Sequence, residues 1–220
     1  MAQDGVTPPA FDETDGRAPP KGRPIVAFDF DGTLTIRDSF TAFLRWRSGP
    51  VRDALGMAAL APAALRYLID RDRGRIKAAA ARTFLAGLPQ EELQAQAEAF
   101  AADRSASLFR PDALATWAEW RDRGALMVIV TASPTHVVRP FARRLQADEL
   151  IGTEFAFDAQ QRLTGGFATP NCRGPQKVAR LEARFGPGVR LAAAYGDTGG
   201  DREMLAIAAT AGYRVFTGQP

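Results

Sequence analysis

The stretch Ile25–Thr35, IVAFDFDGTLT, decides the fold of this chain of 220 residues. Its first four residues, Ile25–Phe28, form a short apolar run of the kind found in a buried parallel strand. The run ends at Asp29, a second acid, Asp31, follows two residues later, and Gly32 then permits a tight turn. The sequence therefore predicts a buried strand that ends in a pair of carboxylates.

Two later apolar runs also end in reactive side chains. Ala125–Val130 leads into the hydroxyl of Thr131, and Arg190–Gly196 leads into Asp197, with Asp201 four residues further on. In open α/β sheets the ligand crevice lies beyond the carboxyl ends of the strands. We therefore expect these side chains to converge with the first acid pair in one small volume.

Several carboxylates in one small volume repel one another unless a cation neutralises them. A few carboxylates, completed by water and a phosphate, suit Mg²⁺. We expect Asp29, Asp31 and Asp197 to hold this ion, with the backbone carbonyl of Asp31 as an alternative to its side chain. Asp201 joins the metal group as a support for the other ligands.

The order of the predicted elements indicates an α/β fold with a doubly wound, mostly parallel sheet. Strands and helices alternate from about residue 110, which favours right-handed crossovers. Residues 38–109 show helical spacing and no strand pattern, so they predict a helical cap inserted after the first strand. We expect a disordered tail at 1–23 and a core formed by 24–37 and 110–220. Further expected elements are a hairpin at Phe155–Thr169, a helix that begins at Pro134 with Ser133 as its N-cap, a helix at Asp201–Ala209 and a last strand at Tyr213–Phe216.

The composition is that of an ordinary globular protein, with 46% apolar and 24% charged residues. The net charge is only +3 and the arginines are scattered, so we expect no nucleic-acid partner. A single cysteine, Cys172, excludes an internal disulfide and favours a reducing, cytoplasmic location. The first residues lack the pattern of a secretory signal, and no obligate protein partner is indicated.

Four segments, in order, resemble the four motifs of the haloacid dehalogenase superfamily: DFDGTLT, VIVTASP, the lysine of GPQKVARL and YGDTGGDREML. The helical block after the first motif resembles the cap of that superfamily. The segments TASP and NCRGPQK are similar to those of its phosphoserine-phosphatase-like subfamily, known as subfamily IB. The resemblance covers residues 24–216 and implies a Rossmann-like core.

This resemblance implies Mg²⁺-dependent phosphoryl transfer through an aspartyl-phosphate. Asp29 would be the nucleophile, and Asp31 the acid toward the leaving alkoxide and then the base for water. Thr131 and the backbone at Ala132 would bind the phosphoryl oxygens, and Lys177 would offset negative charge. Of the other reactive side chains, His136 and Cys172 are interpreted as structural.

Other activities remain open beside a phosphatase. Dehalogenation, within the same superfamily, needs no acid for an alkoxide leaving group, so Asp31 argues against it. A phosphomutase would keep the phosphoryl group and is left open. A regulator without catalysis would not need this complete set of residues.

The resemblance implies a small-molecule or lipid phosphomonoester as the substrate. Phosphoserine phosphatases carry an acid nine residues after the nucleophile, and here that position is Asp38, which would also suit a helix N-cap. The motif reads DGT where those enzymes usually have DST. Lipid-phosphate relatives, the phosphatidylglycerophosphatases, have apolar cap segments, and Ala54–Ile69 is such a segment. It is too short to span a membrane but could contact its surface, or face the core of the cap instead.

Overall fold

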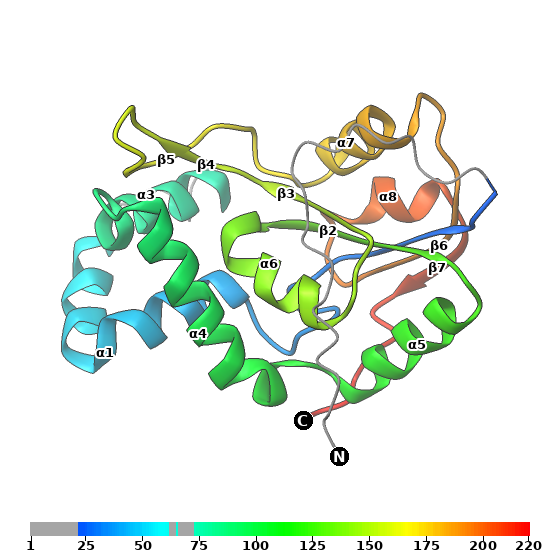
Figure 1. Ribbon diagram of the computed structural model, residues 1–220, viewed down its shortest axis with the longest axis horizontal. Helices are drawn as coiled ribbons and strands as arrows, with labels where there is room; N and C mark the ends of the chain where they lie inside the picture. Colours follow the sequence, from blue (N-terminus) through cyan, green and yellow to red (C-terminus); the bar gives the residue numbers. More distant parts are fainter. Residues whose placement is uncertain (1–21, 62–64, 66–72) are drawn as a thin grey trace, which may run out of the picture.

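The computed structural model describes residues 22–61, 65 and 73–220, and its centre is a five-stranded parallel sheet (Figure 1). The strand order is β3-β2-β1-β6-β7. These strands are β1 (Ile25–Phe28), β2 (Leu126–Pro134), β3 (Glu149–Thr153), β6 (Leu191–Gly196) and β7 (Ala208–Tyr213). The predicted doubly wound α/β fold is confirmed.

The first strand, β1, lies in the middle of the sheet, where the strand order reverses. Ala27 pairs with Val128 of β2 on one side and with Ala194 of β6 on the other. The chain adds β2 and β3 in one direction and β6 and β7 in the other. The crevice at such a reversal is where open α/β sheets bind ligands, and Asp29 stands at its edge.

Alternate residues of the strands pack on opposite faces of the sheet. Met127 and Ile129 of β2 belong to a core that includes residues of α5 (Pro111–Asp122) and α6 (Thr135–Arg144). Leu126, Val128 and Val130 belong to a second core with residues of α7 (Pro175–Phe185) and α8 (Arg202–Ala206). Successive side chains of a strand point to opposite faces of the sheet, so a continuous apolar run suits a strand that is covered on both faces.

A helical segment is inserted between β1 and α5 and forms the cap (Figure 1). Its helices are α1 (Ser39–Ala59), α3 (Arg73–Leu85) and α4 (Gln90–Leu108). The two chain crossings between core and cap pair with each other: the Ile36 N–H donates to the Leu108 carbonyl at 2.8 Å, and the Arg110 N–H to the Leu34 carbonyl at 2.9 Å. The cap is therefore joined to the core by a short paired stalk.

The expected hairpin is present as β4 (Phe155–Phe157) and β5 (Leu163–Phe167), which pair antiparallel. It lies against α3 of the cap. A Cβ atom at Gly165 would lie 2.6 Å from the Cα atom of Arg82, so only glycine permits this contact. The hairpin thus provides a second contact between the core and the cap.

The last helix and the last strand differ from their predicted ranges. The helix expected at 201–209 ends at Ala206, and the strand expected at 213–216 is wrong, because β7 already spans Ala208–Tyr213. Pairing with β6 explains the difference: Ala211 lies opposite Ala194, and the Gly212 backbone lies against the Tyr195 ring. Tertiary pairing overrides the helix preference of an alanine-rich stretch. The edge strand β3, which mixes polar and apolar residues, was not among the predicted strands.

Of the apolar cap segment Ala54–Ile69, residues 62–64 and 66–69 lie outside the residues that the structure describes. Within the described ranges, no helix combines the length and the apolar character that a membrane span requires.

Phe141 of α6 joins the cap to the core. Its ring lies 5.6 Å from that of Phe100 in α4, 5.6 Å from that of Phe30 after β1 and 5.7 Å from that of Phe109 in the stalk. We predict that Phe141→Ala lowers the free energy of unfolding by about 3–5 kcal/mol, because it leaves a cavity among rings that do not collapse. Urea unfolding measures this loss. Phe185→Ala, at a half-buried ring on α7, is the control, and an equal loss in both variants would contradict the prediction.

Candidate active site

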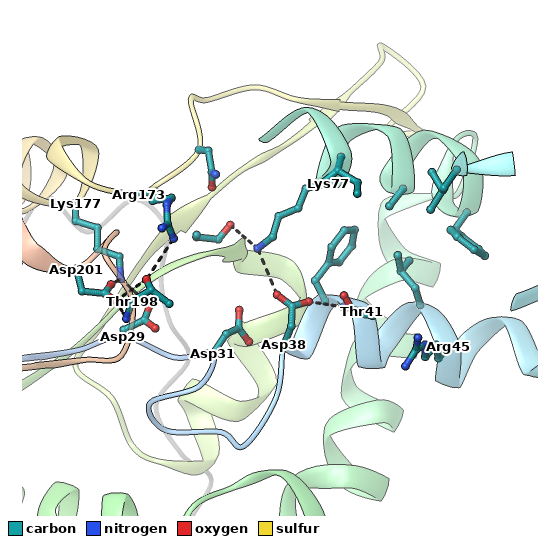
Figure 2. A pocket seen from close by; sticks show the side chains of 18 residues that line it. Asp29, Asp31, Asp38, Thr41, Arg45, Lys77, Arg173, Lys177, Thr198 and Asp201 are labelled. Atoms are coloured by element: carbon teal, nitrogen blue, oxygen red, sulfur yellow. Dashed lines mark hydrogen bonds and ion pairs between the residues drawn. The ribbon is translucent and has the colours of Figure 1, made fainter. Parts of the chain in front are cut away.

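A buried ammonium group ties together the strand ends and the first turn of α7. Lys177 Nζ donates to Asp29 Oδ1 at 2.6 Å and to the Val130 carbonyl at 2.5 Å, and it pairs with Asp201 Oδ1 at 2.7 Å (Figure 2). The Lys177 side chain is 1% exposed. A charge buried to this degree requires partners, and these two carboxylates and one carbonyl supply them.

Burial and charge shift the pKa values of this cluster in opposite directions. Burial raises the pKa of Asp29 to about 7, although Lys177 opposes this. Burial alone would lower the pKa of Lys177, but the charges of Asp29 and Asp201 outweigh it and raise that pKa above its usual range. Burial likewise opposes ionisation of Asp201, yet Lys177 and the donors of Thr198 lower its pKa. Lys177 is therefore charged at neutral pH.

Three carboxylates from β1 and from the loop after β6 form a group that fits a metal ion. Oxygens of Asp29, Asp197 and Asp201 lie within 4.8 Å of one another. Asp197 Oδ1 is buried without a hydrogen-bond partner, and burial together with Asp201 raises the pKa of Asp197. An unpaired buried carboxylate oxygen costs free energy that a cation would recover. Hard oxygen donors of this kind suit Mg²⁺, and the ion would neutralise the remaining negative charge.

Gly32 is required for this arrangement on two grounds. Its φ of +85° favours glycine, and a Cβ atom there would lie 2.2 Å from Asp197 Oδ2. The glycine thus permits the loop after β1 to touch the loop after β6.

The side chain of Asp31 turns away from the three metal-site carboxylates. Its Oδ1 accepts the Ser39 N–H at 2.7 Å, and its Oδ2 accepts the Ser133 hydroxyl. Burial and the charge of Asp38 raise the pKa of Asp31, while Lys77 and these two donors oppose the shift. A metal contact through the backbone carbonyl of Asp31 stays a prediction.

Ser133 does not cap the following helix, so that prediction is wrong. The strand β2 continues through Pro134, which is the N-cap residue of α6, and the helix begins at Thr135. The Ser133 hydroxyl donates to Asp31 and its N–H donates to Thr131 Oγ1 at 3.0 Å, and both bonds hold the residue in the strand.

Thr131 and Ala132, which were predicted to bind the phosphoryl group, have different surroundings. Thr131 is fully buried within β2, and its hydroxyl oxygen accepts the Ser133 N–H. Ala132, by contrast, lines the cavity that opens above the acids. The role of Thr131 stays a prediction.

The cavity has a volume of about 370 Å³ and lies between core and cap. Its core end carries Asp29, Asp31, Lys177 and Asp201 (Figure 2). Its cap end is mainly apolar and is lined by Phe40, Leu44, Leu60, Ile76, Ala80 and Phe84, with the polar side chains of Thr41 and Arg45 beside them. A cavity of this size holds a small molecule, and its core end is charged while its cap end is mainly apolar.

Asp38 and Lys77 lie side by side at the middle of this cavity (Figure 2). Asp38 has the capping role that its position suggested, because its Oδ1 accepts the Thr41 N–H at 2.7 Å in the first turn of α1. Its Oδ2 lies 3.7 Å from Lys77 Nζ. Sequence reasoning missed Lys77, since one lysine in an alanine-rich cap helix gives no signal before the cap is placed on the core.

His136 and Cys172 have surroundings that agree with the structural roles expected for them. His136 Nδ1 lies 3.9 Å from Glu154 Oε2, and its ring packs against Phe155 and Phe157 of the hairpin. Cys172 is fully buried in the second core, where burial raises the pKa of its thiol.

Residues 26–206 match the family model of the haloacid dehalogenase-like hydrolases. The chain belongs to this family. The resemblance of its four motifs to that superfamily is thereby confirmed.

Individual proteins are similar to this haloacid dehalogenase-like hydrolase in sequence or in structure. Protein CicA of Caulobacter vibrioides is 56% identical over 196 residues, which are 89% of this chain and 88% of that protein. A protein of unknown function from Bordetella pertussis Tohama I has a similar structure, with a TM-score of 0.69 and 24% identity over 84% of this chain and 86% of that one. A substrate-bound phosphoserine phosphatase has a TM-score of 0.56 and 18% identity over 88% and 87% of the two chains. At these identities the two structures show the shared fold.

We predict that Mg²⁺ raises the melting temperature of this haloacid dehalogenase-like hydrolase and that the effect weakens in acid. Below about pH 7 the ion must displace a proton from Asp29, so its affinity falls by up to about tenfold per pH unit and levels off above pH 7. Thermal melts with and without Mg²⁺, from about pH 5.5 to pH 8, measure this dependence.

Asp197→Asn is expected to remove most of the Mg²⁺ effect, whereas Asp122→Asn, at an exposed acid on α5, is expected to keep it. An equal Mg²⁺ response in both variants would show that the ion binds elsewhere.

Proposed function

We propose that the chain is a Mg²⁺-dependent phosphomonoester phosphatase that works through an aspartyl-phosphate on Asp29. The observation that carries the proposal is the buried contact of Lys177 with Asp29 beside a carboxylate of Asp197 that lacks a partner. A strongly anionic centre with one fixed ammonium suits a dianionic phosphate only when a divalent cation completes it. The family assignment supports hydrolysis as the general class of reaction.

In the proposed reaction an oxygen of Asp29 attacks phosphorus in line, and the bond from phosphorus to the leaving oxygen breaks. Asp31 gives its proton to that oxygen and later takes one from the water that hydrolyses the aspartyl-phosphate. Lys177 offsets negative charge on Asp29 and on the phosphoryl oxygens. Bound Mg²⁺ would add positive charge at the same place. The cap would exclude bulk water while the intermediate exists.

The substrate that we propose is a phosphomonoester whose leaving group carries hydrocarbon, such as the lipid phosphate phosphatidylglycerophosphate. The mainly apolar cap end of the cavity supports this choice, because it offers apolar surface to the hydrocarbon part of the leaving group. In this lipid the polar glycerol headgroup would lie next to the acids, and the hydrocarbon would lie farther away. In this proposal the enzyme acts in the cytoplasm, and its cap makes a peripheral contact with the membrane surface.

A second candidate is a small amino-acid phosphate such as phosphoserine. Asp38 and Lys77 present a carboxylate and an ammonium side by side in the cavity, which complements the ammonium and carboxylate of an amino acid. The shared fold with phosphoserine phosphatases agrees with this candidate.

A panel of phosphomonoesters tests the proposal. We predict Mg²⁺-dependent phosphate release from p-nitrophenyl phosphate by the wild type, and none after chelation or in Asp29→Asn. Transfer of the phosphoryl group to an added alcohol or sugar, with no release of free phosphate, would favour a phosphomutase. Complete inactivity toward every phosphomonoester with Mg²⁺ present would favour a regulator without catalysis.

The same panel separates the two substrate candidates. For a lipid phosphate, phosphatidylglycerophosphate in mixed micelles should give a higher kcat/KM than phosphoserine, and Asp38→Asn should affect the lipid reaction little. A strong preference for phosphoserine that Asp38→Asn abolishes would instead establish the amino-acid phosphate.

A further inference from the structure

Three groups from separate elements form a chain of hydrogen bonds that ends on Asp31. Lys77 Nζ, on α3 of the cap, donates to Ser133 Oγ at 3.3 Å and to the Ala132 carbonyl at 3.4 Å. Ser133, at the end of β2, donates its hydroxyl to Asp31 Oδ2. Ser133 is fully buried, and Asp31 and Lys77 line the cavity.

The direction of these bonds follows from the number of hydrogens on each group. An ammonium can only donate, so the contact with Lys77 uses a lone pair of the Ser133 oxygen. The Ser133 hydroxyl has one hydrogen, and this hydrogen is left for Asp31. The third neighbour of the ammonium is Asp38, at 3.7 Å, so its donors face three acceptors.

The second oxygen of Asp31 is held in the same manner. Asp31 Oδ1 accepts the Ser39 N–H, and a backbone amide also can only donate. Each carboxyl oxygen therefore has one lone pair occupied by a fixed donor. A proton on Asp31 would be excluded from both of these positions and directed to a lone pair on the cavity side.

We infer that Ser133 is a positioning residue that directs the acid proton of Asp31 toward the leaving group, and that Lys77 of the cap fixes the direction of the Ser133 hydroxyl. This inference rests on the proposed function, because it requires Asp31 to protonate a leaving alkoxide. It also makes the acid step depend on the cap, since Lys77 and Ser39 both belong to cap helices. Without the Lys77 contact the Ser133 hydroxyl is free to rotate and accept the proton of Asp31.

The test compares leaving groups. A series of ring-substituted phenyl phosphates, from p-nitrophenyl to p-methoxyphenyl, needs increasing help from an acid as the leaving phenol becomes more basic. We predict that Ser133→Ala lowers kcat/KM by about 10- to 100-fold for the poorest leaving groups and by less than about threefold for p-nitrophenyl phosphate. The slope of log kcat/KM against the leaving-group pKa therefore becomes steeper.

Two further variants separate a positioning role from a structural one. Lys77→Met should also make the slope steeper, so the test remains available if Ser133→Ala folds poorly. The control for Lys77→Met is Arg82→Met, at an exposed position of the same helix. Thr135→Val removes a buried hydroxyl that donates to Glu154 at 2.6 Å, two residues from Ser133. Both controls should leave the slope of the wild type unchanged.

The outcomes distinguish this inference from the proposed function. An active wild type whose slope is unchanged in both Ser133→Ala and Lys77→Met would overturn the positioning role and leave the phosphatase intact. A wild type that releases no phosphate from any member of the series with Mg²⁺ would overturn the proposed function, and the inference with it.

Discussion

The buried ammonium of Lys177 is the interaction on which the site depends. It contacts Asp29 after β1, the Val130 carbonyl of β2 and Asp201 before α8, so one side chain connects both halves of the sheet. Breaking a buried pair by removing one partner typically costs about 3–5 kcal/mol, because the remaining charge is left without compensation. The same contact keeps the Asp29 carboxylate in a fixed orientation at the reversal of the strand order.

Lys177 neutralises only part of the negative charge in the site, and the charge that remains is the basis of the proposed function. Asp29, Asp197 and Asp201 are three carboxylates that share one ammonium, and Asp197 Oδ1 has no partner. Burial raises the pKa of Asp29 to about 7, so without a further cation this proposed nucleophile is only partly ionised at neutral pH. A divalent ion would remove this penalty and at the same time bring positive charge to the phosphate. The proposed metal requirement and the phosphatase proposal thus have the same electrostatic origin.

The sequence was most informative where chemistry follows directly from the end of a strand. Asp29, Asp197 and Asp201 could be predicted as one group, because parallel strands bring their carboxyl ends to one edge of the sheet. The sheet, the hairpin and the inserted cap were predicted for a similar reason, since each depends on a local pattern of apolar residues.

Features that depend on contacts between distant segments could not be predicted. Lys77 acquires a role only when α3 is placed over β2, and Ser133 was assigned to a helix cap because its bond to Asp31 spans 102 residues. The alanine-rich strand β7 has little β preference of its own and forms because β6 offers a free edge. In each case the deciding partner lies far away in the sequence.

The most direct test of the central claim is to trap the covalent intermediate. Enzyme mixed with substrate and Mg²⁺, quenched in acid within the first turnovers and digested, should yield the peptide that contains Asp29 with the added mass of one phosphoryl group. Reduction with borohydride should convert that residue alone to homoserine. A phosphoryl group found on another residue would contradict Asp29 as the nucleophile. The same conclusion would follow if the enzyme turned over but no phosphorylated peptide appeared, either in the wild type or in a variant whose hydrolysis step is slowed, such as Asp31→Asn.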